Sequence, residues 1–135
     1  MSRYVIDAPT LLRVVADEVL VSPRHQIVAP NRIRSEALSR LLDAVRHGDL
    51  SEDLALEHHE RLTGLRMRLL GDRVSRLTAW KIARDQGWQT IYDAEYLAIT
   101  KLQADALVTI DPALASKARD LVPLAPLEAL TAEAD

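Results

Sequence analysis

The chain has 135 residues and a formal net charge of −3, with 48% of its residues hydrophobic and 27% charged, and this length suits one compact domain, residues 1–135. The absence of cysteine excludes disulfides, thiolate metal sites and cysteine nucleophiles, and it fits a reducing cytoplasm. No apolar run approaches the roughly 20 residues of a membrane span, and the start of the chain lacks the apolar core of a signal peptide, so we expect an unexported cytoplasmic protein.

The first half of the chain alternates short β-branched runs with helical patterns. Residues 3–7, "RYVID", predict a strand, and apolar residues then recur at helical spacing over residues 8–20. A second strand is predicted over residues 26–30, followed by an amphipathic helix over residues 33–48. A further helix is predicted over residues 51–64.

The second half continues the alternation. "LRMRLL" alternates apolar and basic residues, which favours a strand with one solvated face, and "ALVTI" is the clearest buried strand. The expected elements are a strand over 65–70, helices over 72–87 and 94–102, a strand over 106–110, a helix over 111–121 and a strand over 122–124. Strands separated by helices favour a mostly parallel sheet covered on both faces, so the predicted fold class is α/β, a three-layer α/β/α sandwich.

Four acidic residues lie near the ends of these elements, and each has an explanation that involves no function. Asp7, Asp93 and Asp111 are candidate helix N-caps, because an aspartate side chain accepts hydrogen bonds from the free amides of a first turn. Pro112 strengthens this interpretation for Asp111, since proline favours the first helical position. Glu36 has an arginine four residues to either side, and exposed ion pairs of that spacing contribute roughly 0.3–0.5 kcal/mol each.

The joint arrangement of these acids indicates a cation site. Asp7 and Asp111 both leave the carboxyl ends of apolar strands, where ligands bind in parallel sheets. Glu36 and Asp93 lie near the starts of two helices that could approach the same edge. Carboxylates gathered away from water repel one another unless a cation neutralises them, and Mg²⁺ and Mn²⁺ prefer oxygen ligands. Such a site suits phosphoryl chemistry, because the ion lowers the pKa of an attacking water.

Three blocks of the sequence carry a resemblance to a known family. They are "YVIDAPTLL", "PNRIRSEALSRLL" and "TIYDAEYLAITKLQADALVTIDPAL". In their order and across nearly the whole chain, they resemble the PIN domain, and within it the VapC class of bacterial toxin–antitoxin ribonucleases. The last block is the most specific, with Y-D-A-x-Y-L-A at its start and L-V-T-x-D at its end. The resemblance implies a PIN-like sandwich that forms a single domain.

The same resemblance implies a metal-dependent endoribonuclease. In that family, acidic positions bind Mg²⁺ or Mn²⁺ and direct water at an RNA phosphodiester, without a covalent enzyme intermediate. Residue by residue, these positions fall on Asp7, Glu36, Asp93 and Asp111. Thr109 matches a small hydroxyl position beside the last acid, although a β-branched residue also suits a strand. The resemblance further implies a homodimer and a small VapB-type antitoxin that blocks the site.

The first block departs from the family at one position. The family often has a small hydroxyl residue two places after the first acid, where this chain has Pro9. Thr10 is the nearest hydroxyl in the sequence. The family's hydroxyl contact in this block is therefore an open point.

Basic residues on the predicted helices are candidates for an RNA groove, because phosphate contacts need cations without base specificity. The candidates are Arg13, Arg32, Arg34, Arg73, Arg76 and Lys81. Solvated helix faces are the more common explanation for such residues, and the negative net charge argues against nonspecific coating of nucleic acid. Trp80 and Trp88 could stack on bases, but the scarcity of aromatic residues favours packing in the core or in a dimer.

Two other phosphate-handling folds that gather acids fit less well. A receiver domain needs a pair of acids after the first strand and a lysine after the last one, but Ala8 follows Asp7 and no lysine adjoins "VPL". A haloacid-dehalogenase phosphatase needs an aspartate at the position that Pro9 occupies. A noncatalytic PIN-like module that binds RNA or protein is an open alternative, because a sequence reports neither metal occupancy nor turnover.

Overall fold

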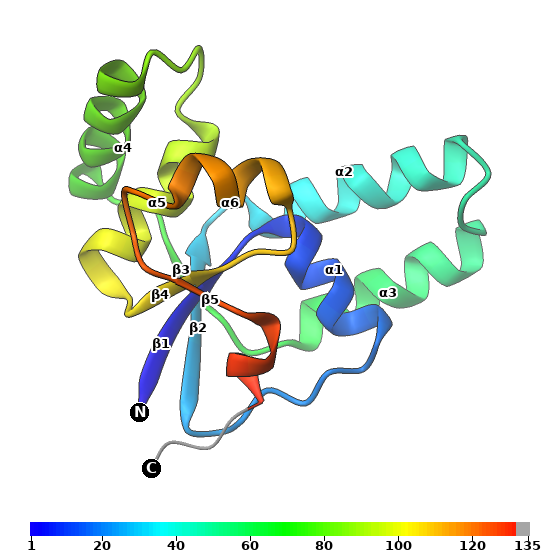
Figure 1. Cartoon of the computed structure of the whole chain (residues 1–135). Coiled ribbons are helices and arrows are strands. Elements are labelled where there is room, and N and C mark those ends of the chain that lie inside the picture. Colours follow the sequence, from blue (N-terminus) through cyan, green and yellow to red (C-terminus); the bar gives the residue numbers. More distant parts are fainter. Residues whose placement is uncertain (132–135) are drawn as a thin grey trace.

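Five strands form one parallel sheet in the structure, a computed structural model that describes residues 1–131 (Figure 1). The strands lie in the order β3-β2-β1-β4-β5, and the pairings between neighbours are parallel. Their bounds are Ser2–Ile6 for β1, His25–Pro30 for β2, Arg68–Leu70 for β3, Ala106–Val108 for β4 and Leu124–Ala125 for β5. The single domain was predicted over residues 1–135, and its last part, residues 132–135, lies outside the described residues.

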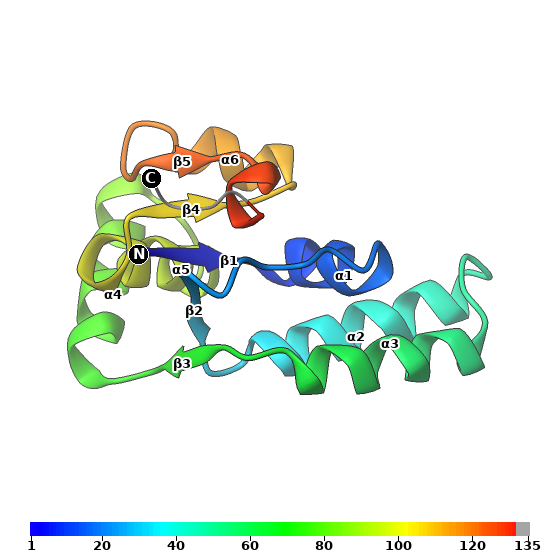
Figure 2. The same ribbon diagram turned by 90° about the horizontal axis from the view of Figure 1, so that it is seen from below.

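Helices cover both faces of this sheet. On one face, α5 contacts β1, β2 and β4, and α4 packs against α5. On the other side, α1, α2 and α3 pack against one another, and the α2–α3 pair extends past the sheet (Figures 1 and 2). The bounds are Ala8–Ala16 for α1, Ile33–Arg46 for α2, Glu52–Gly64 for α3, Arg73–Gln86 for α4, Tyr92–Gln103 for α5, Pro112–Ala118 for α6 and Leu127–Leu130 for the 3₁₀ helix η1.

This arrangement confirms the predicted α/β class and the three-layer α/β/α sandwich. Within residues 1–131, the sheet is entirely parallel where a mostly parallel sheet was expected. No helix in that same stretch combines the length and the apolar content needed to cross a membrane.

The strands β1 and β4 contribute fully buried residues to the core. Val5, Ile6, Leu107 and Val108 are each 0% exposed. Successive residues of a strand point to opposite faces, so burial of adjacent side chains requires a helical layer on both faces. The three layers therefore explain the continuous apolar runs from which these strands were predicted.

The first helix is shorter than predicted. The helical pattern extended over residues 8–20, but α1 ends at Ala16. Glu18 has a left-handed φ of 52°, and the amide of Val19 donates to the carbonyl of Val14 at 2.9 Å, which satisfies the end of the helix as in a Schellman motif. The apolar Val19 continues the helical spacing past this end, so periodicity alone overextends the helix.

The later strands are also shorter than, or shifted from, their predictions. Of the predicted residues 65–70, only Arg68–Leu70 forms β3, and β5 is Leu124–Ala125 where residues 122–124 were expected. Both are edge strands, which pair on one side only. The predicted strand 106–110 ends at Val108, because the next two residues turn into hydrogen bonds with the loop and helix that follow β1.

Replacing Gly87 by alanine is expected to lower the free energy of unfolding by about 1 kcal/mol, because Gly87 ends α4 with a left-handed φ of 73°. Gly64→Ala, in the last turn of α3, is the matched control and is expected to raise it by about 0.4–1 kcal/mol. An added Cβ meets nothing within 4 Å at either position, so the two sites differ in backbone conformation alone. Urea unfolding measures both variants, and equal effects would contradict this explanation.

Candidate functional site

The order of the strands creates a switch point at the carboxyl ends of β1 and β4. The chain passes from β1 outward through β2 and β3, and then crosses to the other side of β1 for β4 and β5. In open parallel sheets, a crevice forms at the carboxyl ends where the connections reverse direction. Because α5 packs on the sheet and leads directly into β4, its first turn lies at the same edge. The acids that follow β1 and β4 and those in the first turns of α2 and α5 therefore share one end of the sheet.

Asp7 is the most buried of the four predicted acids, with 3% of its surface exposed. It caps α1 as predicted, since its Oδ1 accepts from the amide of Thr10 at 3.2 Å. The hydroxyl of Thr10 donates to the same oxygen. The hydroxyl of Thr109 donates to Oδ2 at 2.7 Å. In the described part of the chain, the donors that reach this carboxylate are thus all uncharged, although a buried carboxylate usually has a cationic partner.

The two threonines also join the end of β1 to the end of β4. The amide of Ile110 donates to the hydroxyl of Thr10 at 3.0 Å, and the amide of Asp111 donates to the hydroxyl of Thr109 at 3.0 Å. Asp111 caps α6 as predicted, with its Oδ1 accepting from the amide of Ala113 at 3.0 Å. The hydroxyl contact that was an open point in the first block is therefore made by Thr10. A hydroxyl three residues after an N-cap acid, at the position that faces the cap, is the signal in the sequence that marks it.

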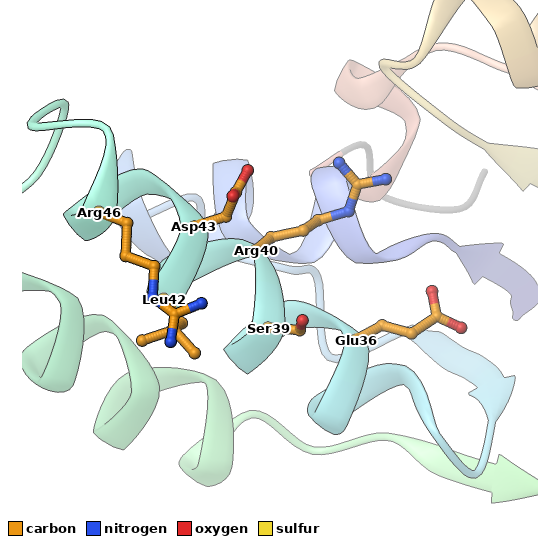
Figure 3. A pocket seen from close by; sticks show the side chains of 6 residues that line it. All are labelled: Glu36, Ser39, Arg40, Leu42, Asp43 and Arg46. Atoms are coloured by element: carbon orange, nitrogen blue, oxygen red, sulfur yellow. The ribbon is translucent and has the colours of Figure 1, made fainter.

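Glu36 lies in the first turn of α2, where it forms an ion pair with Arg32, just before this helix, and a hydrogen bond with Tyr96 of α5. Its Oε1 is 2.7 Å from the Nε of Arg32, and the hydroxyl of Tyr96 donates to its Oε2 at 3.1 Å. Of the two exposed ion pairs predicted from spacing, only the one with Arg32 forms within residues 1–131, and its side chains are only 28% and 32% exposed. Burial raises the pKa of Glu36 above its usual value, although the positive charges of Arg32 and Arg40 favour the charged form. Arg40 lies one turn further along α2 than Glu36 (Figure 3).

Tyr96 was not among the predicted site residues, yet it lies close to two of the acids. It is 3% exposed and projects from α5 toward Glu36 on α2. Burial raises the pKa of Tyr96 above its usual value, and the negative charges of Glu36 and Asp7 raise it further. Its hydroxyl therefore stays protonated at neutral pH and acts as a donor that orients the Glu36 carboxylate. In the sequence, the apolar ring of Tyr96 suits the buried face of an amphipathic helix. The pattern therefore indicates a packing role and does not indicate the hydrogen bond that its hydroxyl makes.

Arg32, a candidate for RNA binding, is used inside the protein. Besides its contact with Glu36, its Nη2 is 3.2 Å from Glu95 Oε1 and donates to the carbonyl of Tyr92 at 3.1 Å. Its guanidinium carbon also lies 3.9 Å from the centre of the Tyr92 ring. These contacts tie the first turn of α5 to the start of α2, so Arg32 acts first as a structural link at this edge.

The other basic candidates divide into one engaged internally and four at the surface. Arg34 donates to the carbonyl of Leu65 at 3.1 Å and so holds α2 to the end of α3. The four exposed residues are Arg13, Arg73, Arg76 and Lys81. Arg13 is 3.7 Å from Asp17 on the same helix, and Arg76 donates to the carbonyl of Gly71. Arg73, Arg76 and Lys81 are exposed side chains of α4.

The prediction that Asp93 is an N-cap is wrong. The helix α5 begins at Tyr92, after Ile91, and Asp93 lies inside its first turn. The helix dipole favours an acidic residue in the first turn, which explains why an aspartate lies near the start of α5 without being its cap. Asp93 Oδ2 instead accepts from the ammonium of Lys117 on α6 at 3.0 Å. That ammonium also lies 4.8 Å from the centre of the Trp88 ring.

The chemistry of these donors fits a hard divalent cation. All four predicted ligands are carboxylates, and Asp7 is a buried one whose partners are uncharged. Glu36 and Asp93, by contrast, are each neutralised by a cationic side chain of the chain itself. Within residues 1–131, no three acidic or histidine side chains are gathered closely enough to hold a metal ion in this arrangement. A cation bound by Glu36 or Asp93 would therefore compete with Arg32 or Lys117 for the same carboxylate.

The raised pKa of Glu36 predicts a pH-dependent stability difference between the wild type and Glu36→Gln. Since the folded state binds this proton more tightly than the unfolded state, folding opposes the charged form. The wild type should therefore gain stability relative to the variant as pH falls from neutral to the usual glutamate pKa of about 4.3. Urea unfolding of both proteins at several pH values in chelator measures this. A pH-independent difference would contradict the raised pKa.

Comparison with known proteins bears on the fold. No family model and no curated protein matches the sequence. Among solved structures, the chain is similar to the crystal structure of PAE2754 from Pyrobaculum aerophilum, with a TM-score of 0.73 and 23% sequence identity. The similarity covers 96% of this chain and 93% of that chain. The α/β/α sandwich around a parallel sheet is thus shared with a known structure over nearly its whole length.

Proposed function

We propose that this protein is a Mg²⁺- or Mn²⁺-dependent endoribonuclease that hydrolyses RNA phosphodiester bonds. One observation carries the proposal: the buried Asp7 carboxylate lies at the switch point of the sheet, oriented by two threonines and balanced by uncharged donors. A buried anion in such a setting favours a cation that comes from outside the chain. The resemblance of the sequence to VapC-type PIN domains supports the same activity.

The side chains at this edge have distinct parts in the proposed reaction. Asp7, Glu36, Asp93 and Asp111 would hold the ion, which when bound lowers the pKa of a water and shields the charge that develops on the phosphate. The hydroxyls of Thr10 and Thr109 orient Asp7, and the hydroxyl of Tyr96 orients Glu36. Hydrolysis then adds water across the bond between phosphorus and the leaving 3′ oxygen. The exposed basic residues on α1 and α4 supply positive charge for the RNA backbone.

Cleavage of single-stranded RNA by the purified protein is expected with Mg²⁺ or Mn²⁺ and not with excess chelator. The physical reason is that a divalent ion held by these acids would both lower the pKa of a water and shield the charge on the phosphate. Gel analysis of a labelled RNA, with and without chelator, measures this. Undiminished cleavage in chelator would overturn the metal-dependent mechanism.

Asp93→Asn is expected to lower the cleavage rate by about 10-fold to 100-fold, because the variant retains one oxygen but loses the charge that attracts the ion. Asp120→Asn is the matched control, since Asp120 is an exposed aspartate after α6, toward the amino end of β5. Initial rates at a fixed Mn²⁺ concentration measure both variants. Equal rates for Asp93→Asn and the wild type would remove Asp93 from the proposed site.

The proposal includes the biological setting that the VapC resemblance implies: a cytoplasmic toxin that forms a homodimer and is blocked by a VapB-type antitoxin. The exposed apolar side chains of α4 and the start of α5 support an association surface. They are Val74 at 59%, Leu77 at 48%, Trp80 at 53% and Tyr92 at 56% exposure. Light scattering of the purified protein tests the homodimer, and copurification from the native cell tests the antitoxin.

A noncatalytic RNA- or protein-binding module is the second candidate, and one observation favours it. Two of the four acids are already paired with cations of the chain, Glu36 with Arg32 and Asp93 with Lys117. A module without turnover would keep these pairs. RNA binding without cleavage in Mg²⁺ and Mn²⁺, together with no measurable Mn²⁺ binding, would favour this candidate over the nuclease.

A further inference from the structure

Lys117 bridges two elements at the proposed site, although neither composition nor the three sequence blocks singles it out. Its ammonium is 3.0 Å from Asp93 Oδ2 and 4.8 Å from the centre of the Trp88 ring. The Lys117 and Asp93 side chains are 41% and 48% exposed, so both are accessible from solvent. Lys117, Asp93 and Trp88, together with Gln89 and Thr90, line one hollow at this edge. A cation of the chain thus lies at an acid that is proposed to bind a metal ion.

An ammonium in this position and a divalent ion on the same carboxylate repel each other. Both would lie within a few ångströms of Asp93, and at such distances the repulsion is only partly screened by salt. The lysine side chain has a flexible stem with four carbons and can move without disturbing α6. The Trp88 ring offers the ammonium a second favourable contact that does not involve Asp93.

We propose that Lys117 is the internal counter-ion of Asp93, that a divalent ion displaces it from the carboxylate, and that the displaced ammonium then binds a backbone phosphate of the RNA. The inference rests on the proposed function, because it takes Asp93 as a metal ligand. The Asp93 carboxylate exchanges one cation for another, and Lys117 exchanges one anion for another. In the absence of metal, the pair keeps an acid at the site neutralised. With metal, the same lysine becomes a phosphate-binding residue beside the reacting bond.

The first test is a Mn²⁺ titration of Lys117→Gln by calorimetry, without RNA. Removing the competing ammonium is expected to tighten Mn²⁺ binding about twofold to fivefold, the range set by the strength of an exposed ion pair. Lys101→Gln is the matched control, since it removes the same charge from an exposed position on α5 about 12 Å further along the helix than Asp93. Tighter binding in Lys117→Gln alone supports the exchange. Equal affinities in Lys117→Gln and the wild type, or an equal gain in both variants, overturn it.

The second test concerns the phosphate contact and uses cleavage kinetics at saturating Mn²⁺. Lys117→Gln is expected to raise the KM for a single-stranded RNA with little change in kcat. The slope of log KM against log salt concentration should fall by about 0.7, the value of one lost phosphate contact on a single strand. An unchanged salt slope overturns the phosphate contact, whatever the change in KM.

Failure of the inference and failure of the proposed function have different signatures. A wild type that neither binds Mn²⁺ nor cleaves RNA overturns the proposed function, and the inference with it. If the wild type binds Mn²⁺ and cleaves RNA, and Lys117→Gln has the same Mn²⁺ affinity as the wild type, the inference alone is overturned. Circular dichroism of each variant confirms that it is folded, which the exposure of both lysines leads us to expect.

Discussion

Asp7→Asn is expected to lower kcat for RNA cleavage by at least about 100-fold while the protein stays folded. The substitution removes the charge of the most buried acid at the site and keeps its shape. The amide oxygen of the introduced asparagine can accept from Thr10, and its NH₂ group can donate to the hydroxyl of Thr109, which has two lone pairs and so accepts more than one hydrogen bond. Initial rates on a labelled RNA at saturating Mn²⁺ measure the effect.

The stability of the same variant separates loss of chemistry from loss of fold. In chelator, the free energy of unfolding of Asp7→Asn should equal or exceed that of the wild type, because an uncharged amide replaces a buried charge whose partners are uncharged. Asp17→Asn, at an exposed aspartate just after α1, is the control and should change neither rate nor stability. Retained cleavage by Asp7→Asn would exclude Asp7 from the reaction. A loss of several kcal/mol in stability would attribute the lost activity to unfolding.

Leu107→Ala is expected to lower the free energy of unfolding by about 2–5 kcal/mol, a large share of the roughly 5–15 kcal/mol of a typical domain. Leu107 is 0% exposed on β4, where helical layers cover both faces of the sheet, so its removal leaves a cavity. Urea unfolding followed by circular dichroism measures the change.

Leu102→Ala is the matched control for this substitution. Leu102 lies near the end of α5 with 42% of its surface exposed, so the same truncation there should cost less than about 1 kcal/mol. Comparable losses at the two positions would contradict the assignment of β4 to the centre of the core. A changed slope with urea in Leu107→Ala would indicate an altered unfolded state instead of a cavity.

Much of the architecture follows from local patterns in the sequence. The positions of β1, β2 and β4 follow from short apolar runs, and α2, α3 and α4 begin and end within a few residues of their predicted bounds. The caps at Asp7 and Asp111 were also predicted correctly, because a cap depends on the side chain and the next three residues. The pattern misled at two helix ends. The apolar Val19 continued the helical spacing past the end of α1, and Asp93, taken for a cap, lies inside α5, which begins one residue earlier at Tyr92.

The contacts within the candidate site depend on long-range neighbours, which no local pattern encodes. Asp7 and Thr109 are 102 positions apart, and Glu36 and Tyr96 are 60 apart. Arg32 was taken for a solvent-facing or RNA-binding residue, yet it contacts Glu36 and Glu95 because α2 and α5 start at one edge of the sheet. Lys117 reaches Asp93 for the same reason, since α6 begins where β4 ends.

The sequence alone therefore predicted the order of strands and helices in an α/β chain. It also predicted that acidic residues lie at the boundaries of these elements, where their chemistry suits a hard cation. The tertiary structure decided which of those acids are buried, which are paired with the protein's own cations, and which hydroxyls orient them. The physical reason is that hydrogen bonds and ion pairs act over a few ångströms. The order in which the strands pair brings residues within that range whatever their separation along the chain.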